Sequence, residues 1–326
     1  MDDGLQIENE VLIGGRGELF LARGAHSVLQ FARGAVTPNA ASVANMKANL
    51  DSRRERADKA GTRYMHLVAP EKYQLYRDDF PIQNPKSLAH FYMEAGCKGI
   101  SYPVEELAGG DEDRSYFRTD THWAAHGLMR VALLIGARAG IPQDRLNRAR
   151  EEMLAALAPA PEEFFGDLGR KLVPPRGEVQ LLLRPSHSLA SEENGIGHDY
   201  TRPVNDGRLI VTNSLHPEAA GTVLIFGDSY LFHALSYLSY LFCRSVFCRT
   251  RFYHDEMVVM AKPDIVVTQA AERYLGFVHA DTTAPPFLML PYLLGRAPSF
   301  SPRAAQTIAL GLAGGRKVDF GLFQPR

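Results

Sequence analysis

The chain has 326 residues, with 36 lysines and arginines against 37 aspartates and glutamates, and 45% of its residues are hydrophobic. This composition excludes disorder over most of the chain, and the net charge of -1 gives no reason to expect binding to nucleic acid or to an anionic membrane. The length allows roughly three quarters of the surface to be buried, which suffices for one large α/β domain or two smaller ones.

The N-terminal part predicts a hairpin, a helix and a strand in that order. Val11–Ile13 and Leu19–Leu21 flank a glycine-rich turn at 14–17, which is typical of a β-hairpin. Apolar spacing predicts a helix over Ser42–Lys59, with Ser42 as its N-cap. Tyr64–Val68 then reads as a buried strand.

The rest of the chain repeats the alternation of helix and strand. The segments, in order, are a helix over Trp123–Ala137, a strand over Thr222–Phe226, a helix over Tyr230–Phe242, a strand over Ser245–Cys248, a helix over His254–Ala261 and a strand over Asp264–Thr268. Short apolar strands that alternate with helices predict an α/β fold with a doubly wound sheet. Residues 159–206 are rich in Pro, Gly, Glu and Ser, and predict an insertion or long loop over the sheet edge.

The cysteines and the first residues bear on the cellular compartment. Cys97, Cys243 and Cys248 are too few for a disulfide framework, and we expect Cys243 and Cys248 to be buried free thiols. The acidic N-terminus shows no signal segment, and the longest apolar stretches are too short or interrupted to span a bilayer. We therefore expect a cytoplasmic protein, or a periplasmic one if the chain is a trimmed form.

The sharpest local feature is an apolar strand that leads directly into Gly227, Asp228 and Ser229. Such a turn lifts a serine hydroxyl to the C-terminal edge of a parallel sheet, where ligands of open α/β sheets bind. Gly227 permits close backbone approach, and the helix that follows directs N–H groups at a developing oxyanion. The segment indicates either a nucleophilic serine or a serine that only caps a helix.

The second feature is Asp120-Thr121-His122, directly before the helix predicted from Trp123. A nucleophilic serine needs a base to take its proton, and the base needs a carboxylate to fix its tautomer. Asp-x-His supplies both, because a turn at a helix start can fold Asp120 onto Nδ1 of His122 and leave Nε2 free. The alternative makes Asp120 an N-cap and His122 an exposed polar residue.

A metal site is the third interpretation of the same segment. His122 and His126 have the i, i+4 spacing of two ligands on a helix. However, Trp123 stands where the H-E-x-x-H motif has its glutamate, and no third ligand is apparent. We therefore predict neither a metal nor another bound cofactor.

Together, the Gly-Asp-Ser-Tyr and Asp-Thr-His-Trp segments resemble those of the alginate O-acetyltransferase family, which consists of AlgX/AlgJ-like, SGNH-hydrolase-like acyltransferases. In that family, too, the Asp-x-His segment precedes the serine. Residues 11–21, 67–76, 166–169 and 263–275 resemble further family blocks in the right order, although Glu18 stands where an aromatic residue is usual. The resemblance spans about residues 10 to 280 and implies a three-layer α/β/α sandwich with a mostly parallel sheet.

The resemblance implies a catalytic triad in which Ser229 is the nucleophile, His122 the base and Asp120 the residue that orients the base. The backbone N–H of Ser229 is the natural first donor to an oxyanion, and the second donor stays open. The candidates for the oxyanion hole or the cleft are Gly227, Asp228, Tyr230 and Asn213.

Substrate-binding residues follow from the same resemblance. Glu272 and Arg273 look like the family's Glu-Arg pair, so that Arg273 either anchors an acyl donor or a sugar, or closes the sheet with a salt bridge. The other candidates, with surface solvation as the alternative, are Lys72, Tyr116, Arg118 and Trp123.

The blocks favour one catalytic domain over residues 1–281, with residues 282–326 as a C-terminal extension packed on it. We expect an O-acetyltransferase that moves an acetyl group through a serine acyl-enzyme to a hydroxyl of a polysaccharide or glycan. The expected partners are this carbohydrate acceptor, an acetyl donor (acetyl-CoA or a membrane-delivered acyl group) and polysaccharide-assembly proteins. With water as acceptor the same triad would make an acetylesterase, and with a silent site the protein would be a scaffold in polysaccharide assembly.

Overall fold

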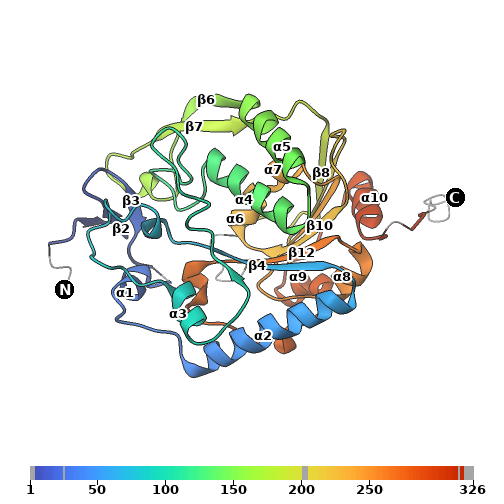
Figure 1. Ribbon diagram of the computed structural model, residues 1–326, viewed down its shortest axis with the longest axis horizontal. Helices are drawn as coiled ribbons and strands as arrows, with labels where there is room; N and C mark the ends of the chain where they lie inside the picture. Colours follow the sequence, from blue (N-terminus) through green and yellow to red (C-terminus); the bar gives the residue numbers. More distant parts are fainter. Residues whose placement is uncertain (1–3, 25, 200–204, 315, 319–326) are drawn as a thin grey trace.

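A seven-stranded sheet with the order β5-β4-β12-β10-β11-β9-β8 forms the centre of the computed structural model (Figure 1). The structure describes residues 4–24, 26–199, 205–314 and 316–318. The strands are β4 Arg63–Ala69, β5 Ile100–Ser101, β8 Leu189–Glu193, β9 Leu209–Ser214, β10 Thr222–Gly227, β11 Arg244–Arg249 and β12 Ile265–Ala271. Those from β5 to β11 in this order run parallel, and β9 is antiparallel to both β11 and β8. The predicted mostly parallel sheet is confirmed.

Helices cover both faces of the sheet, which explains why the central strands are nearly continuous apolar runs. On one face, Ile225 and Phe247 belong to a core with α4 (Ala125–Arg138), α5 (Gln143–Ala155), α6 (Ser229–His233) and α7 (Leu235–Leu238). On the other face, Leu224 and Phe226 pack with α8 (Asp255–Ala261) and α10 (Pro302–Gly311). The helices α2 (Ala40–Lys59) and α3 (Leu88–Glu94) share a further core with Val68 of β4 (Figure 1). These three layers confirm the predicted α/β sandwich.

Smaller elements surround the sandwich. The predicted hairpin is present, with Val11 opposite Leu21, and an additional strand extends it to three strands. These strands are β1 Ile7–Glu8, β2 Val11–Ile13 and β3 Leu19–Leu21. The remaining elements are α1 Val28–Ala32, the antiparallel pair β6 Leu157–Phe164 and β7 Glu178–Leu183, α9 Leu290–Leu293, and single 3-10 turns at Lys72–Gln74, Gly169–Lys171, Glu272–Gly276, Asp281–Thr283 and Phe287–Met289.

Three predicted helix boundaries are wrong, each for a local reason. Asn39, not Ser42, caps α2, because its side-chain oxygen accepts the N–H of Ser42 at 2.8 Å. The helix predicted from Trp123 begins at Ala125, because Trp123 forms an isolated β-bridge with Tyr116. The helix predicted over residues 230–242 consists of α6 and α7, which meet at Ala234.

The segment 159–206 and the described part of the C-terminal segment 282–326 both contain helices or strands. Residues 159–206 include most of β6, all of β7, and β8, which joins the central sheet, so this segment is not one long loop, and its status as an insertion stays a prediction. The described part of residues 282–326 includes α9 and α10, and Ile308 of α10 is buried with Leu209 and Val211 of β9. Residues 1–3, 25, 200–204, 315 and 319–326 lie outside the described residues, and the division at residue 281 stays a prediction.

The structure bears on two further expectations. Cys97 and Cys248 are buried free thiols, but Cys243 is exposed, so its predicted burial was wrong. Within the described ranges, none of the helices combines the length and the apolar character needed to cross a membrane.

Candidate active site

Ser229 lies at the turn between β10 and α6, at the C-terminal edge of the parallel strands. Asp228 pins this turn: its carboxylate accepts the N–H of Tyr230 at 3.0 Å and the N–H of Ala271, at the end of β12, at 2.7 Å. Glycine at position 227 leaves room for Gln269, because a Cβ there would lie 2.8 Å from the side-chain oxygen of that residue. The turn is therefore fixed to the neighbouring strand, and Ser229 stays half-buried.

The loop that carries Asp120 and His122 is held from two sides. The carbonyl of Thr119 accepts the N–H groups of Leu168 and Gly169, at 3.1 and 2.8 Å. The carboxylate of Glu178 on β7 accepts the backbone N–H groups of Arg118 and Thr119, at 3.0 and 2.7 Å. Since the segment Gly166–Gly169 and strand β7 both hold this loop, its position depends on tertiary contacts as well as on its own sequence.

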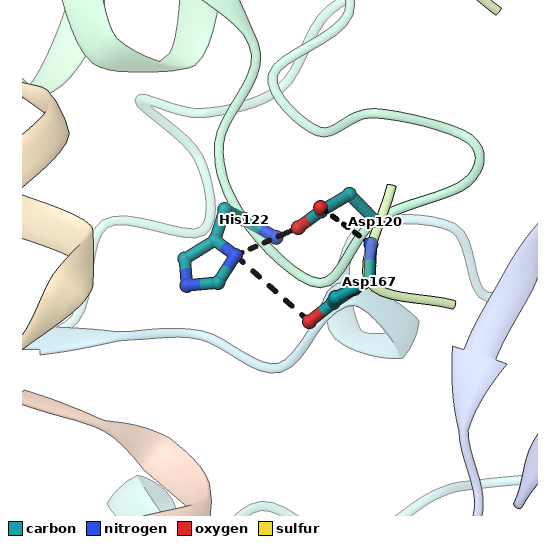
Figure 2. Close-up of side chains that lie close together, drawn as sticks. All are labelled: Asp120, His122 and Asp167. Atoms are coloured by element: carbon teal, nitrogen blue, oxygen red, sulfur yellow. Dashed lines mark hydrogen bonds and ion pairs between the residues drawn. The ribbon is translucent and has the colours of Figure 1, made fainter. Parts of the chain in front are cut away.

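The two features meet at the sheet edge. Nε2 of His122 lies 2.8 Å from Oγ of Ser229, and Nδ1 of His122 lies 2.7 Å from Oδ1 of Asp120 (Figure 2 shows the Asp120–His122 part). Both distances are within hydrogen-bond range. The structure therefore places the three predicted residues in the sequence of hydrogen bonds that activates a serine in hydrolases and acyltransferases.

Electrostatics of the pair favour an ionised acid and a basic imidazole. Burial disfavours the charge on Asp120, but hydrogen bonds from His122 and from the N–H of Asp167 lower the pKa of Asp120 well below its usual range. Burial would lower the pKa of His122, but its hydrogen bond to Asp120 and the charges of Asp120 and Asp167 raise this pKa above 6.5. Asp120 thus stays charged, and the imidazole is a stronger base than in water.

Asp167 is a site residue that the sequence did not predict. Its carboxylate lies 4.0 Å from Nδ1 of His122 (Figure 2). The same carboxylate accepts the N–H of Thr121 at 2.8 Å and the hydroxyl of Thr121 at 2.6 Å. Its own N–H donates to Asp120 at 2.8 Å. The Gly-Asp-Leu-Gly block at 166–169 was the signal available for this residue, but no spacing rule joins it to residue 122.

Asp120, His122 and Asp167 are also the residues on which the alternative of a metal site depends. Potential ligand atoms of Asp120, His122 and Asp167 lie within 4.8 Å of one another. However, Nδ1 and Nε2 of His122 already face Asp120 and Ser229 at hydrogen-bond distance. His126, the second ligand in the metal interpretation, is not among these residues. The two hydrogen bonds of His122 are those that proton transfer requires.

The oxyanion candidates differ in their available donors. The N–H of Asp228 donates to Gln269 at 2.9 Å, and the N–H of Tyr230 donates to Asp228, so both are committed to the turn. Asn213 lies opposite Arg244, the first residue of β11, and therefore at the other end of the sheet from Ser229. The assignment of Asn213 to the site was wrong, because β9 is antiparallel to β11.

Lys72 and Arg118 belong to a cluster of charged side chains around Glu18, next to the loop that carries Asp120 and His122. The buried carboxylate of Glu18 contacts Lys72 at 3.0 Å, Arg118 at 3.1 Å, and Arg114. Lys72 is 3% exposed, and its ammonium also donates to the carbonyls of Leu19 and Arg118, at 2.9 and 2.8 Å. Glu18 thus carries the anion that these cations need, and Lys72 is not free for a substrate.

Glu272 and Arg273 are also buried, and they do not pair with each other. Glu272 accepts from the N–H of Glu71 and the hydroxyls of Ser87 and Tyr102, all within 2.8 Å. Arg273 forms an ion pair with Glu71 at 2.9 Å and donates to the hydroxyl of Tyr230 at 3.3 Å. These buried contacts agree with a structural salt bridge of Arg273 rather than with an anchor for an acyl donor or a sugar.

Tyr116 and Trp123 pack inside the molecule, with 0% and 1% of their surface exposed. Tyr116 donates its hydroxyl to the carbonyl of Pro70, and both rings make edge contacts with the ring of Tyr230. This burial leaves no surface for a sugar, so their assignment to substrate binding was wrong. Instead, both rings pack against Tyr230, whose own ring lies beside that of His122.

Comparison with known proteins gives the family. The model of the SGNH hydrolase-like domain of acetyltransferase AlgX matches residues 25–231, more than half of the chain. The chain belongs to this family. The AlgX-family match includes the Asp120–His122 loop and the Ser229 turn. Among curated protein sequences, no match was found.

Solved structures with TM-scores above 0.5 share the fold of this AlgX-family chain at low sequence identity. A DHHW family protein from Eubacterium siraeum is 12% identical, with a TM-score of 0.59 over 91% of this chain and 98% of its own. PatB1 from Bacillus cereus is 13% identical, with a TM-score of 0.57 over 83% of this chain and 96% of its own. The O-acetyltransferase domain of Pseudomonas putida AlgJ is 17% identical, with a TM-score of 0.48 over 88% of this chain and 99% of its own.

Proposed function

We propose that this protein is a serine-dependent O-acetyltransferase that acetylates a hydroxyl of a polysaccharide or glycan. The observation that carries the proposal is the pair of short contacts at His122, 2.8 Å to Ser229 and 2.7 Å to Asp120. Membership in a family of acetyltransferase domains supports acetyl transfer as the reaction, and the sequence resemblance to alginate O-acetyltransferases supports a carbohydrate acceptor.

In the first half-reaction, Oγ of Ser229 attacks the acetyl carbonyl while Nε2 of His122 takes the hydroxyl proton. Asp120 holds the tautomer with its proton on Nδ1 and stabilises the imidazolium that forms. The backbone N–H of Ser229, the first in α6, is the proposed donor to the oxyanion. His122 then returns the proton to the leaving group, and the acetyl-serine remains.

In the second half-reaction, a sugar hydroxyl takes the place of the leaving group. Its proton passes to Nε2 of His122 as its oxygen bonds to the acetyl carbon, and the bond from that carbon to Oγ of Ser229 breaks. The proton then returns to Oγ. The donor is an activated acetyl group, either the thioester of acetyl-CoA or an acyl group delivered by a membrane protein. The first fits a cytoplasmic enzyme and the second a periplasmic one that works with polysaccharide-assembly proteins.

The test combines mass spectrometry of the intact protein with product analysis. Wild type incubated with p-nitrophenyl acetate should gain one acetyl group on Ser229, and added oligosaccharide should collect it. Ser229→Ala should lose the adduct and about 10⁴-fold or more of the turnover. Ser236→Ala, on α7, serves as the matched control and should leave both unchanged.

Two results would contradict the proposal. Full turnover in Ser229→Ala would remove the nucleophile assignment. An acetyl-enzyme that yields only acetate at saturating oligosaccharide would make the protein an esterase.

A further inference from the structure

A second histidine stands beside the proposed base. His233 is the last residue of α6, four positions after Ser229, so both side chains lie on the same face of this helix. The ring centroids of His233 and His122 are 5.4 Å apart, with the planes at 72°. His233 is exposed, whereas the other rings close to His122 are buried in the core.

The proposed triad does not use His233, because both nitrogens of His122 already face Ser229 and Asp120. Across the described ranges, neither ring nitrogen of His233 has a hydrogen-bond partner in the protein. Histidines elsewhere in the fold show what a structural role looks like: His66 contacts the Thr268 hydroxyl at 2.9 Å, and His187 contacts the Ser239 hydroxyl at 2.8 Å. An exposed imidazole with open nitrogens next to the base is instead available to a ligand.

The surroundings of His233 keep its ring neutral. Arg208 stacks over Phe232, the preceding residue, with 4.6 Å between its guanidinium and the ring centroid. Arg249 ends β11 opposite Gly227. Partial removal of the ring from water, together with the charges of His122, Arg208 and Arg249, lowers the pKa of His233 to about 4. A neutral imidazole offers one N–H donor and one acceptor nitrogen, which matches a sugar hydroxyl that both donates and accepts.

We propose that His233 binds the acceptor sugar through a hydroxyl adjacent to the one that is acetylated, so that the site selects a vicinal diol over water and over simple alcohols. This inference rests on the proposed acetyl transfer. The reacting hydroxyl must lie at Nε2 of His122, because that nitrogen takes its proton in the second half-reaction. The ring of His233 lies close enough for one sugar ring to reach both histidines.

A binding role for His233 affects only the transfer of the acetyl group to the acceptor, whereas a structural role would also affect formation of the acetyl-enzyme. Formation of the acetyl-enzyme needs no acceptor and should not depend on His233. Transfer to a diol should depend on His233. Loss of its hydrogen bond to the desolvated hydroxyl should destabilise the transition state for transfer and lower the transfer rate about tenfold or more.

The experiment uses the full chain, p-nitrophenyl acetate as donor, and two small acceptors that differ by one hydroxyl: trans-1,2-cyclohexanediol and cyclohexanol. Wild type should acetylate the diol with a second-order rate constant about tenfold above that for cyclohexanol. His233→Ala should abolish this preference and leave the burst of acetyl-enzyme within twofold of wild type. His233→Asn, which keeps a donor and an acceptor, should retain part of the preference. His90→Ala on α3, an exposed histidine whose ring contacts Tyr102, is the matched control.

Two results would overturn the inference: a wild type that acetylates both acceptors without preferring the diol, or equal losses in burst and transfer in His233→Ala. Melting temperatures of the variants identify a loss caused by unfolding. Failure of the proposed function itself looks different, because wild type would then form no acetyl-enzyme, or one that yields only acetate with every acceptor.

Discussion

Two carboxylates lie near Nδ1 of His122, with Asp120 at 2.7 Å and Asp167 at 4.0 Å. The nearer one makes the hydrogen bond that orients the ring, whereas the farther one bonds to Thr121 and acts on the ring through its charge. The pKa of Asp167 is raised by burial and by the charge of Asp120. Asp167 is therefore a positioning residue whose effect should be visible in the pH dependence of the reaction.

The first prediction concerns this pH dependence. The base form of His122 is neutral, and its pKa is raised above 6.5, so kcat/KM should fall with decreasing pH through a midpoint above 6.5. Asp167→Asn removes a negative charge that favours the imidazolium and should move the midpoint to lower pH. Asp144→Asn, a surface substitution on α5, is the control. A pH profile of acetyl-enzyme formation measures this, and an unchanged midpoint in Asp167→Asn would contradict it.

Individual site residues were predictable where the spacing is local. Asp120 and His122 are two residues apart, and Gly227-Asp228-Ser229 is a single turn, so a short window contains each unit. Asp167 and His233 were missed because their closeness to His122 depends on tertiary folding. Asn213 was misplaced because the sequence does not show that β9 runs antiparallel to its neighbour.

At the scale of elements, the loop over residues 116–123 owes its place to two glycines. A Cβ on Gly166 would lie 2.2 Å from the carbonyl oxygen of Thr119, and one on Gly169 would lie 2.1 Å from that of Arg176. Neither glycine has a positive φ, so the constraint is close backbone approach rather than conformation. The central strands were predictable because burial on both faces makes them continuous apolar runs, but this steric constraint was not, since its partners are distant in sequence.

The second prediction tests that constraint. Gly166→Ala should push the loop away from its partner segment, destabilise the fold by about 1–3 kcal/mol and lower kcat at least tenfold. Gly197→Ala, where the added methyl group meets open space, should leave both quantities unchanged. Urea unfolding and single-turnover acetylation provide the readouts, and wild-type behaviour of Gly166→Ala would refute the constraint.

The third prediction concerns the cluster of charged side chains around Glu18. Lys72→Met removes one of the three cations that contact Glu18 in the described part of the chain and the ammonium that donates to the carbonyls of Leu19 and Arg118, and should cost about 1–3 kcal/mol of unfolding free energy. Glu18→Leu in the same chain should recover part of this loss, because it removes a buried carboxylate that has lost one of these cations. Double-mutant-cycle analysis of urea unfolding measures the coupling, and simple additivity would argue against a shared cluster.

At the scale of the whole molecule, the sheet buries a titratable group far from the site chemistry. His66 of β4 is 3% exposed, and its Nδ1 contacts the hydroxyl of Thr268 on the adjacent β12. Burial, and then the charge of Arg53, lower the pKa of His66 to about 3. The unfolded chain therefore binds a proton near pH 6.5 that the folded chain does not bind until about pH 3.

The fourth prediction follows from this difference. The contribution of His66 to stability is fully present above pH 6.5 and is lost as the pH falls toward 3, with about 2 kcal/mol lost by pH 5. His66→Gln cannot take up this proton and should show a correspondingly flatter decline between pH 7.5 and 5. Unfolding free energies measured across this range test it, and parallel curves for the two proteins would contradict it.

Because only one residue separates Asp120 from His122, both side chains move with the same loop. Their contacts lie within one short segment, so a displacement of the loop carries acid and base together as a rigid pair. The gap to Ser229 is the distance that such a displacement changes, because the serine belongs to a separate turn. Substitutions that only displace the loop should therefore slow the reaction while its pH midpoint stays unchanged, whereas substitutions that change a charge beside His122 should move the midpoint.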